Sequence, residues 1–260
     1  MDKANQQQPE PSWNTYIANY EEGKAGITTL RMDLMAQAPF KDYPYLLVVG
    51  FGFDPNPKNG FPKKEDQEKI YEIDDHIIDF VDENTDGLHV GSFTFDGKRL
   101  SYFYLTSAND IDQKLESFFN TQLPGTPPFI DVEEDKEWES YVEFLYPDKD
   151  ILRYMADRDV VMQLEKHGDD LETPRRVDHW SYFKTMDDVS LFSAELLKLG
   201  FEVGEMGETT VGNDPYKCQF WRDEKVELMD IHQVTSELRV LAEKFNGVYD
   251  GWETQIIKPG

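Results

Sequence analysis

Two kinds of hydrophobic pattern alternate along the first half of the chain. A near-continuous apolar and aromatic run at residues 43–53 predicts a strand. From Pro62 to Asn84 the apolar residues recur at helical spacing, which predicts an amphipathic helix with Pro62 in its first turn. Two further strands meet at Asp96–Gly97, a dipeptide typical of hairpin turns. A helix at 110–123 and a strand at 126–134 complete the order β-α-β-β-α-β.

The second half repeats this order of elements. Residues 179–184 predict a strand, and residues 185–200 predict a helix that ends at Gly200. Strands at 201–211 and 216–224 form a hairpin that turns at Gly212–Asp214. A helix at 228–247 and a last strand at 248–257 follow. We therefore predict an α+β fold with two domains, each built on a ferredoxin-like β-α-β-β-α-β unit with an antiparallel sheet.

Further elements lie outside these two units. They are strands at 12–22 and 25–34, which form a hairpin that extends the first sheet, and helices at 135–150 and 151–171. The two helices are interrupted near Pro147, because proline breaks a helix interior. We therefore predict an N-terminal domain of residues 1–147 and a C-terminal domain of residues 148–260.

Charge restricts the expected partners. The chain carries 52 acidic and 26 basic residues, a net charge of −26. Both halves are acidic, at −17 for residues 1–148 and −9 for the remainder. Proteins that bind nucleic-acid phosphates normally carry a basic patch, so we expect no direct contact with nucleic acid. A basic protein surface is a better electrostatic match, although solubility alone would also explain the acidity.

Composition also bears on the compartment. Cys218 is the single cysteine, which excludes an internal disulfide framework and fits a reducing compartment, so we expect a cytoplasmic protein. No apolar run approaches the roughly 20 residues of a membrane helix. Residues 1–12 have no apolar stretch behind their charges, which indicates a short disordered lead and not a secretory signal.

Patterns that carry catalytic or metal chemistry are weak. Cys218 lies within a predicted strand and has no evident histidine partner. The five histidines form no metal-spaced pair. We therefore predict no enzyme activity, no cofactor and no metal. The alternative is a small-molecule or hydrolytic site in a cleft between the domains, where His179 and Arg176 would supply converging polar groups.

Two stretches of the C-terminal half carry a family resemblance. "KHGDDLETPRRVDHWSYF" (166–183) and "LAEKFNGVYDGWET" (241–254) resemble the regulator of ribonuclease E activity B family, in order and in spacing. The resemblance covers roughly residues 150–258. It implies a ferredoxin-like domain that regulates an RNA-degrading endonuclease through protein contacts and has no catalytic activity.

The N-terminal half is similar to a different family. "WNTY", "YPYLLVV", "GFP" before an acidic helix, "FYL" and "YVEFLYP" follow one another as in the domain of unknown function 695 family, over about 140 residues. That similarity implies no particular activity.

Asp250 and Gly251 interrupt the last predicted strand, between Tyr249 and Trp252. Aspartate and glycine seldom lie inside strands. In a ferredoxin-like sheet this strand is antiparallel to the first, which would bring Asp250 and Trp252 near the end of the strand at 179–184. One interpretation is a β-bulge with Trp252 in the core. The other is a rigid aromatic and acidic corner that contacts a partner.

Strand alternation raises a related expectation. If Trp180, Trp221 and Trp252 point the same way, the sheet face without helices carries three tryptophans. Such a platform stacks bases in some RNA-binding modules, but the net charge argues against that role here. Packing against the other domain or a second subunit is the alternative.

The segment "HGDDLETPRRVDHW" is the second dense cluster of candidate residues. An internal charge network that fixes the loop is the expected role of Asp169 and Asp170. Arg175 or Arg176 would instead clamp a carboxylate of the partner or one phosphate. The predicted partner-binding set is Asp169, Asp170, Arg175, Arg176, His179, Trp180, Tyr249, Asp250, Gly251 and Trp252.

These observations combine into one functional prediction. The chain is predicted to be a protein-binding regulator that inhibits an RNA-degrading endonuclease of the ribonuclease E/G type through an acidic, aromatic surface. A homo-oligomer is compatible with the sequence, and no membrane contact is expected.

Overall fold

The computed structural model describes residues 10–210 and 214–258. The expected N-terminal lead and the expected turn at Gly212–Asp214 therefore fall largely outside the described residues. The chain divides into two compact units, the first ending at Ile151 and the second beginning at Leu152. Within the described residues, no helix is both long and apolar enough to cross a bilayer.

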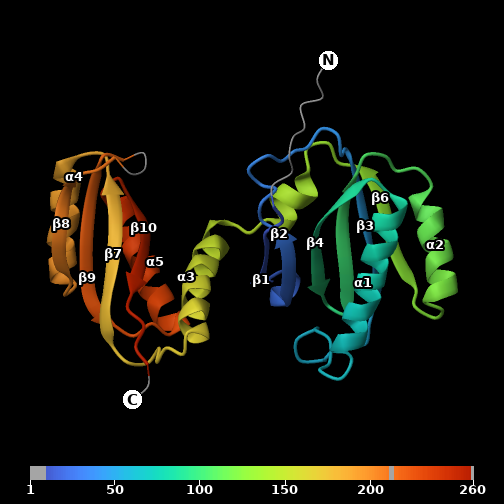
Figure 1. The fold of residues 1–260 in the computed structure, drawn as a ribbon, viewed down its shortest axis with the longest axis horizontal. Helices are drawn as coiled ribbons and strands as arrows, with labels where there is room; N and C mark the ends of the chain where they lie inside the picture. The colour runs from blue at the N-terminus through green and yellow to red at the C-terminus, as the bar shows by residue number, and fades with distance from the viewer. Residues whose placement is uncertain (1–9, 211–213, 259–260) are drawn as a thin grey trace. The chain divides into compact units, whose positions relative to one another are not determined.

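The first unit contains a six-stranded antiparallel sheet (Figure 1). Its strands are β1 (Trp13–Asn19), β2 (Ala25–Arg31), β3 (Tyr45–Gly52), β4 (Gly87–Phe95), β5 (Lys98–Leu105) and β6 (Pro128–Glu134), in the order β1-β2-β4-β5-β3-β6. The last four positions have the order of a ferredoxin-like unit. The β1–β2 hairpin extends the sheet beyond β4, which confirms the predicted extension.

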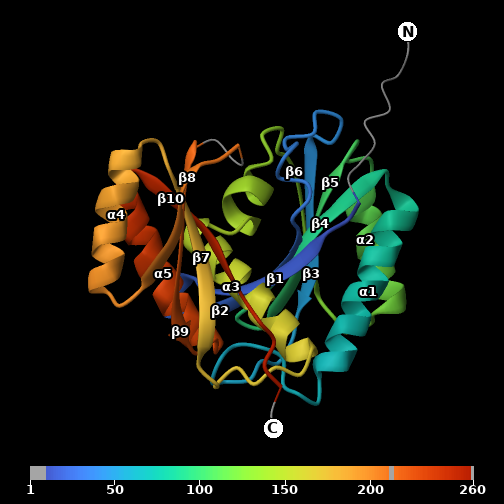
Figure 2. The same cartoon turned by 60° about the vertical axis from the view of Figure 1, so that its left-hand side comes forward.

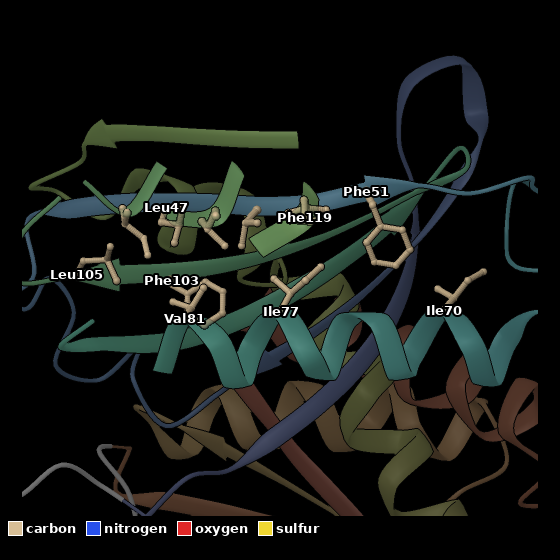
Figure 3. Close-up of a cluster of buried hydrophobic side chains, with 11 residues drawn as sticks. Leu47, Phe51, Ile70, Ile77, Val81, Phe103, Leu105 and Phe119 are labelled. Atoms are coloured by element: carbon tan, nitrogen blue, oxygen red, sulfur yellow. The ribbon is translucent and has the colours of Figure 1, made fainter. Parts of the chain in front are cut away.

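One face of this sheet is covered by α1 (Gln67–Asn84) and α2 (Ile111–Gln122). Figure 3 shows Ile70, Ile77 and Val81 of α1 pointing at the sheet, where they meet Phe51 and Phe103. The helical spacing of these apolar residues is the reason that the helix forms on this face. The predicted start at Pro62 is wrong, because Pro62 forms a β-bridge with Pro55 and the chain is not yet helical there.

The other face of the first sheet is covered by a short π-helix, η2 (Ser140–Leu145), and the residues before it. The buried Trp138 ring stacks on Tyr104 at 4.0 Å between centroids, and its indole N–H donates to the Tyr43 carbonyl at 3.0 Å. The Tyr141 hydroxyl donates to the Arg31 carbonyl at 2.6 Å. These contacts fix the end of the unit against its own sheet.

The second unit is a four-stranded antiparallel sheet with the order β10-β7-β9-β8, which is the ferredoxin-like order (Figure 1). Its elements are β7 (Arg175–Phe183), α4 (Met186–Lys198), β8 (Glu202–Glu208), β9 (Tyr216–Glu224), α5 (Leu228–Lys244) and β10 (Gly247–Thr254), preceded by α3 (Lys149–Lys166). The two sheets, each with interspersed helices, confirm the predicted α+β class.

α4 and α5 pack on one face of the second sheet (Figure 2), and α3 packs beside α5 against Val177 and Trp252. Phe183 and Phe220 meet Phe192 of α4 and Leu238 of α5. The α4 helix begins where the Thr185 hydroxyl accepts a hydrogen bond from the Asp188 N–H. It ends at Lys198, two residues before Gly200, whose φ of +81° is the left-handed conformation that glycine adopts most readily.

Cys218 is fully buried in this core, and burial raises the pKa of its thiol to about 12. We expect an aromatic disulfide reagent to modify the folded chain at least about 1,000-fold more slowly than the urea-unfolded chain, because reaction requires opening of the second unit. The rate at which the reagent releases its aromatic thiol at neutral pH measures the modification of Cys218 directly. A fast stoichiometric reaction without urea would contradict the buried position.

Candidate partner-binding surface

A β-bulge lies at Asp250 in β10, the strand that pairs with β7 at the edge of the second sheet. Tyr249 is opposite Ser181 and Gly251 is opposite Trp180, so Asp250 is the extra residue. Residues three apart on a regular strand point to opposite faces, whereas one extra residue brings them to the same face. The bulge therefore directs both Tyr249 and Trp252 into the helix-covered core, while Asp250 remains exposed.

This register corrects two expectations. Trp252 is opposite His179, in the middle of β7 and not near its end, because the antiparallel pairing starts at Gly247 opposite Phe183 and runs back along β7. β7 itself begins at Arg175, four residues earlier than predicted. Trp180 and Trp221 lie on the other face of the sheet, so the predicted platform of three tryptophans is wrong. Trp252 is only 8% exposed and packs among Val161, Leu164 and Ile231.

The Trp252 indole is tied to a buried carboxylate on α3. Its Nε1 donates to Asp157 Oδ1 at 3.0 Å. The other carboxylate oxygen, Oδ2, accepts from the Thr235 hydroxyl at 2.6 Å and lies 2.9 Å from His232 Nδ1. Arg239 Nη1 is at 3.4 Å from the same oxygen. Asp157 thus joins α3 to α5 and β10 beneath the sheet.

A second buried polar chain runs through His179. Its Nδ1 is 2.8 Å from the Tyr249 hydroxyl, and its Nε2 is 3.2 Å from Glu224 Oε2. The other carboxylate oxygen of Glu224 accepts two hydrogen bonds from Arg222. Burial raises the pKa of the Tyr249 hydroxyl, which therefore stays protonated. Since His179 and Tyr249 are both buried, they position β10 and do not themselves reach the surface.

The loop before β7 is fixed by an internal ion pair. Arg175 donates to both carboxylate oxygens of Asp169, at 2.6 and 2.7 Å, and the Ile257 N–H donates to the same carboxylate at 2.8 Å. Burial alone would raise the pKa of Asp169, but these hydrogen bonds and the Arg175 charge hold it below its ordinary value. Asp170 adds backbone hydrogen bonds with Ile257 and Arg175.

The two arginines that are candidates for clamping a partner have different environments. Arg175 is buried and already paired with Asp169. Arg176 points to the opposite face and is exposed. Its guanidinium lies 3.9 Å from the Trp221 ring centroid and forms two hydrogen bonds with Asp178.

We call the face of the second sheet opposite α4 and α5 the open face. It consists of Arg176, Asp178, Trp180 and Tyr182 on β7, and of Lys217, Gln219, Trp221 and Asp223 on β9. Gln219 also donates to Asp178, so the residues around Arg176 are held in one arrangement. Exposed acids on this side come from the neighbouring strands and the bulge, namely Glu202, Asp250 and Glu253. The result is an aromatic surface with an acidic surround.

Asp157, Glu224 and Arg239 are buried polar residues beneath the candidate surface that the sequence patterns did not identify. Asp157 could have been identified from its spacing, because it lies on the same side of the helix as the apolar residues Val161 and Leu164. A carboxylate in such a buried position needs hydrogen-bonding partners. Among the described residues, no group of three or more His, Cys, Asp or Glu side chains is arranged to hold a metal ion.

Comparison with known families agrees with both resemblances seen in the sequence. Residues 155–254 match the model of the family Regulator of ribonuclease activity B. Residues 11–146 match a family of unknown function, DUF695. No curated protein matches the chain. The region matched by the first model contains the bulge, the open face and the buried Asp157 network.

Proposed function

Because the chain belongs to the DUF695 family and its second unit matches the Regulator of ribonuclease activity B model, we propose that it is a non-catalytic protein that binds and inhibits an RNA-degrading endonuclease. The observation that carries this proposal is the continuous match over residues 155–254. The partner is an endonuclease of the ribonuclease E/G type, and the second unit is the part that binds it.

The open face is the proposed contact surface. Trp180, Trp221 and Arg176 are residue types that dominate protein interfaces when they are held rigidly. Here the Arg176 guanidinium is already fixed between Asp178 and the Trp221 ring, so little side-chain freedom is lost on binding. The residues predicted from the sequence that reach this side are Arg176, Trp180, Asp250 and Gly251.

The buried members of the predicted set have a supporting role in this proposal. Tyr249 and Trp252 anchor the two sides of the bulge in the core, which fixes Asp250 at the surface. The Asp169–Arg175 pair and His179 hold the strand that carries Arg176 and Trp180. Asp170 lies at the half-buried loop beside them.

Charge gives the proposed mode of inhibition. An RNA-degrading enzyme needs a basic surface for its substrate. Glu202, Asp250 and Glu253 would compete with RNA phosphates for that surface, which accelerates association and makes it sensitive to salt. The protein then acts by covering the RNA-binding surface and requires no chemical step of its own.

The test is cleavage of a labelled RNA by the host's endonuclease of the ribonuclease E/G type, with and without the purified protein. We expect slower cleavage and direct binding to the nuclease. Trp180→Ala should weaken that binding about 30-fold, the effect of losing one interface anchor of about 2 kcal/mol. Asp250→Ala should mainly slow association at low salt.

Asp187→Ala is the matched control, because Asp187 is an exposed acid on α4, on the other side of the sheet. It should inhibit like the unmodified protein. Unchanged cleavage together with no nuclease binding would refute the proposal, and binding to the RNA itself would refute the proposed mode of action.

A further inference from the structure

The helical side of the second unit carries an apolar groove that the proposed function does not use. It has a volume of about 400 Å³ and lies between the end of α4 and the middle of α5. Its lining residues are Leu199, Ser236, Glu237, Val240, Leu241 and Lys244. Val240 is 68% exposed, Leu199 49% and the nearby Leu197 62%. This exposed apolar surface would be removed from water if a partner covered it.

These residues are not displaced members of the core. The inward face of α5 is already complete, with Ile231, Leu238 and Ala242 buried against the sheet and its neighbours. Val240 lies on the opposite side of the helix, where a polar residue would be expected in an isolated domain. The groove therefore exposes apolar area that the fold of the unit does not need.

Two charged residues flank the groove in a regular spacing. The Lys198 hydrogen bond, together with the charge of one of them, Lys244, lowers the pKa of the nearby Glu195 carboxyl. Glu237 and Lys244 are seven residues apart, two helical turns, and so they lie along the same side of α5. In the described part of the chain neither forms an ion pair. Glu237 accepts a hydrogen bond from the Gln233 amide, and the Lys244 ammonium lies over the Phe245 ring.

We propose that a second copy of this chain occupies the groove, with the two α5 helices antiparallel about a two-fold axis. An axis between Val240 and Leu241 places Val240 of each copy opposite Leu241 of the other. The same register places Glu237 opposite Lys244, once on each side, because both pairs are centred on the same point of the helix. One symmetric arrangement thus buries the apolar residues and pairs both charges.

A second copy fits this surface better than a basic partner does. The groove carries one acid and one base, whereas the open face is surrounded by acids. The two surfaces lie on opposite sides of the same sheet, because α4 and α5 pack on the face that the open face does not share. Self-association through α5 would therefore leave the proposed nuclease-binding surface free, and the inference is independent of the proposed function.

Sedimentation equilibrium of the full chain at micromolar concentrations tests this proposal. The unmodified chain should form dimers, and Val240→Glu should weaken dimerisation at least 100-fold. Lys244→Glu and Glu237→Lys should each weaken it about 10-fold, and the double variant should restore it to within a few-fold of the unmodified chain. Val248→Glu is the control, because Val248 is also a largely exposed valine, at 58%, and lies on the other side of the sheet, opposite Tyr182.

Each contrary outcome has a defined meaning. A chain that sediments as a monomer throughout overturns the proposal, as does a Val240→Glu variant that dimerises normally. Failure of the double variant to restore dimers overturns the proposed register. Protection of the Cys218 thiol shows that each variant is folded. The nuclease assay with Val240→Glu separates the two proposals, because the monomer should still inhibit cleavage.

Discussion

Replacement of Asp157 by alanine should lower the unfolding free energy of the second unit by about 3–5 kcal/mol, the usual cost of breaking a buried charged network by removing one member. The carboxylate accepts hydrogen bonds from Trp252 and Thr235 and also faces His232 and Arg239. Without it, the buried Arg239 charge loses its counter-ion and the buried Trp252 N–H loses its acceptor. The loss should separate α3 and β10 first, since Asp157 connects them.

Urea titration followed by Cys218 labelling measures this effect, because the single cysteine reports on the second unit alone. Asp159→Ala is the matched control. Asp159 lies on the same helix but its side chain is 49% exposed and paired with the adjacent Arg158. It should unfold at nearly the same urea concentration as the unmodified chain. Equal midpoints for Asp157→Ala and Asp159→Ala would refute the central role of Asp157.

The second large effect is expected at Arg175, where alanine should cost about 3–5 kcal/mol because it leaves the buried Asp169 carboxylate without its counter-ion. The side chains of Asp169 and Arg175 are 0% and 5% exposed. Arg176→Ala is a control at the next position of the same strand. Arg176 is exposed and pairs at the surface, so its loss should leave stability nearly unchanged while it weakens nuclease binding. Urea midpoints from Cys218 labelling distinguish the two variants.

The pH dependence of this pair has a definite sign. The pKa of Asp169 is lower in the folded protein than its ordinary value of 3.8. Its stabilising contribution is therefore fully present above pH 3.8 and is lost as the pH falls through the lower native pKa. The stability difference between the unmodified chain and Arg175→Ala should narrow below about pH 4. A difference that widens with acidification would contradict the assigned ion pair.

The strands and helices could be predicted from the sequence because their patterns are local. The apolar run of β3 and the helical spacing in α1 each specify one element, and Asp96–Gly97 supplies the turn between β4 and β5. The start of α1 was misplaced because Pro62 suits a helical first turn and an extended bridge equally well. Only its pairing with Pro55 decides between them.

The direction of individual side chains was harder to predict, because it depends on strand register. A single bulge residue reverses the face of every residue that follows it. Asp250 and Gly251 were recognised as unusual in a strand, yet the face of Trp252 required the observed pairing with His179. The same limit applies to Arg175 and Arg176, whose opposite environments follow from the position at which β7 begins.

The bulge at Asp250 has a consequence for aggregation as well. β10 is one of the two edge strands of its sheet, so its outer backbone groups would be available to pair with a strand of another molecule. An extra residue in the middle of the strand breaks the regular spacing of those groups, and the exposed carboxylate adds a charge that a neighbouring strand would have to desolvate. The irregularity that turns Trp252 inward thus also protects an acidic, aromatic sheet from growing into a fibre.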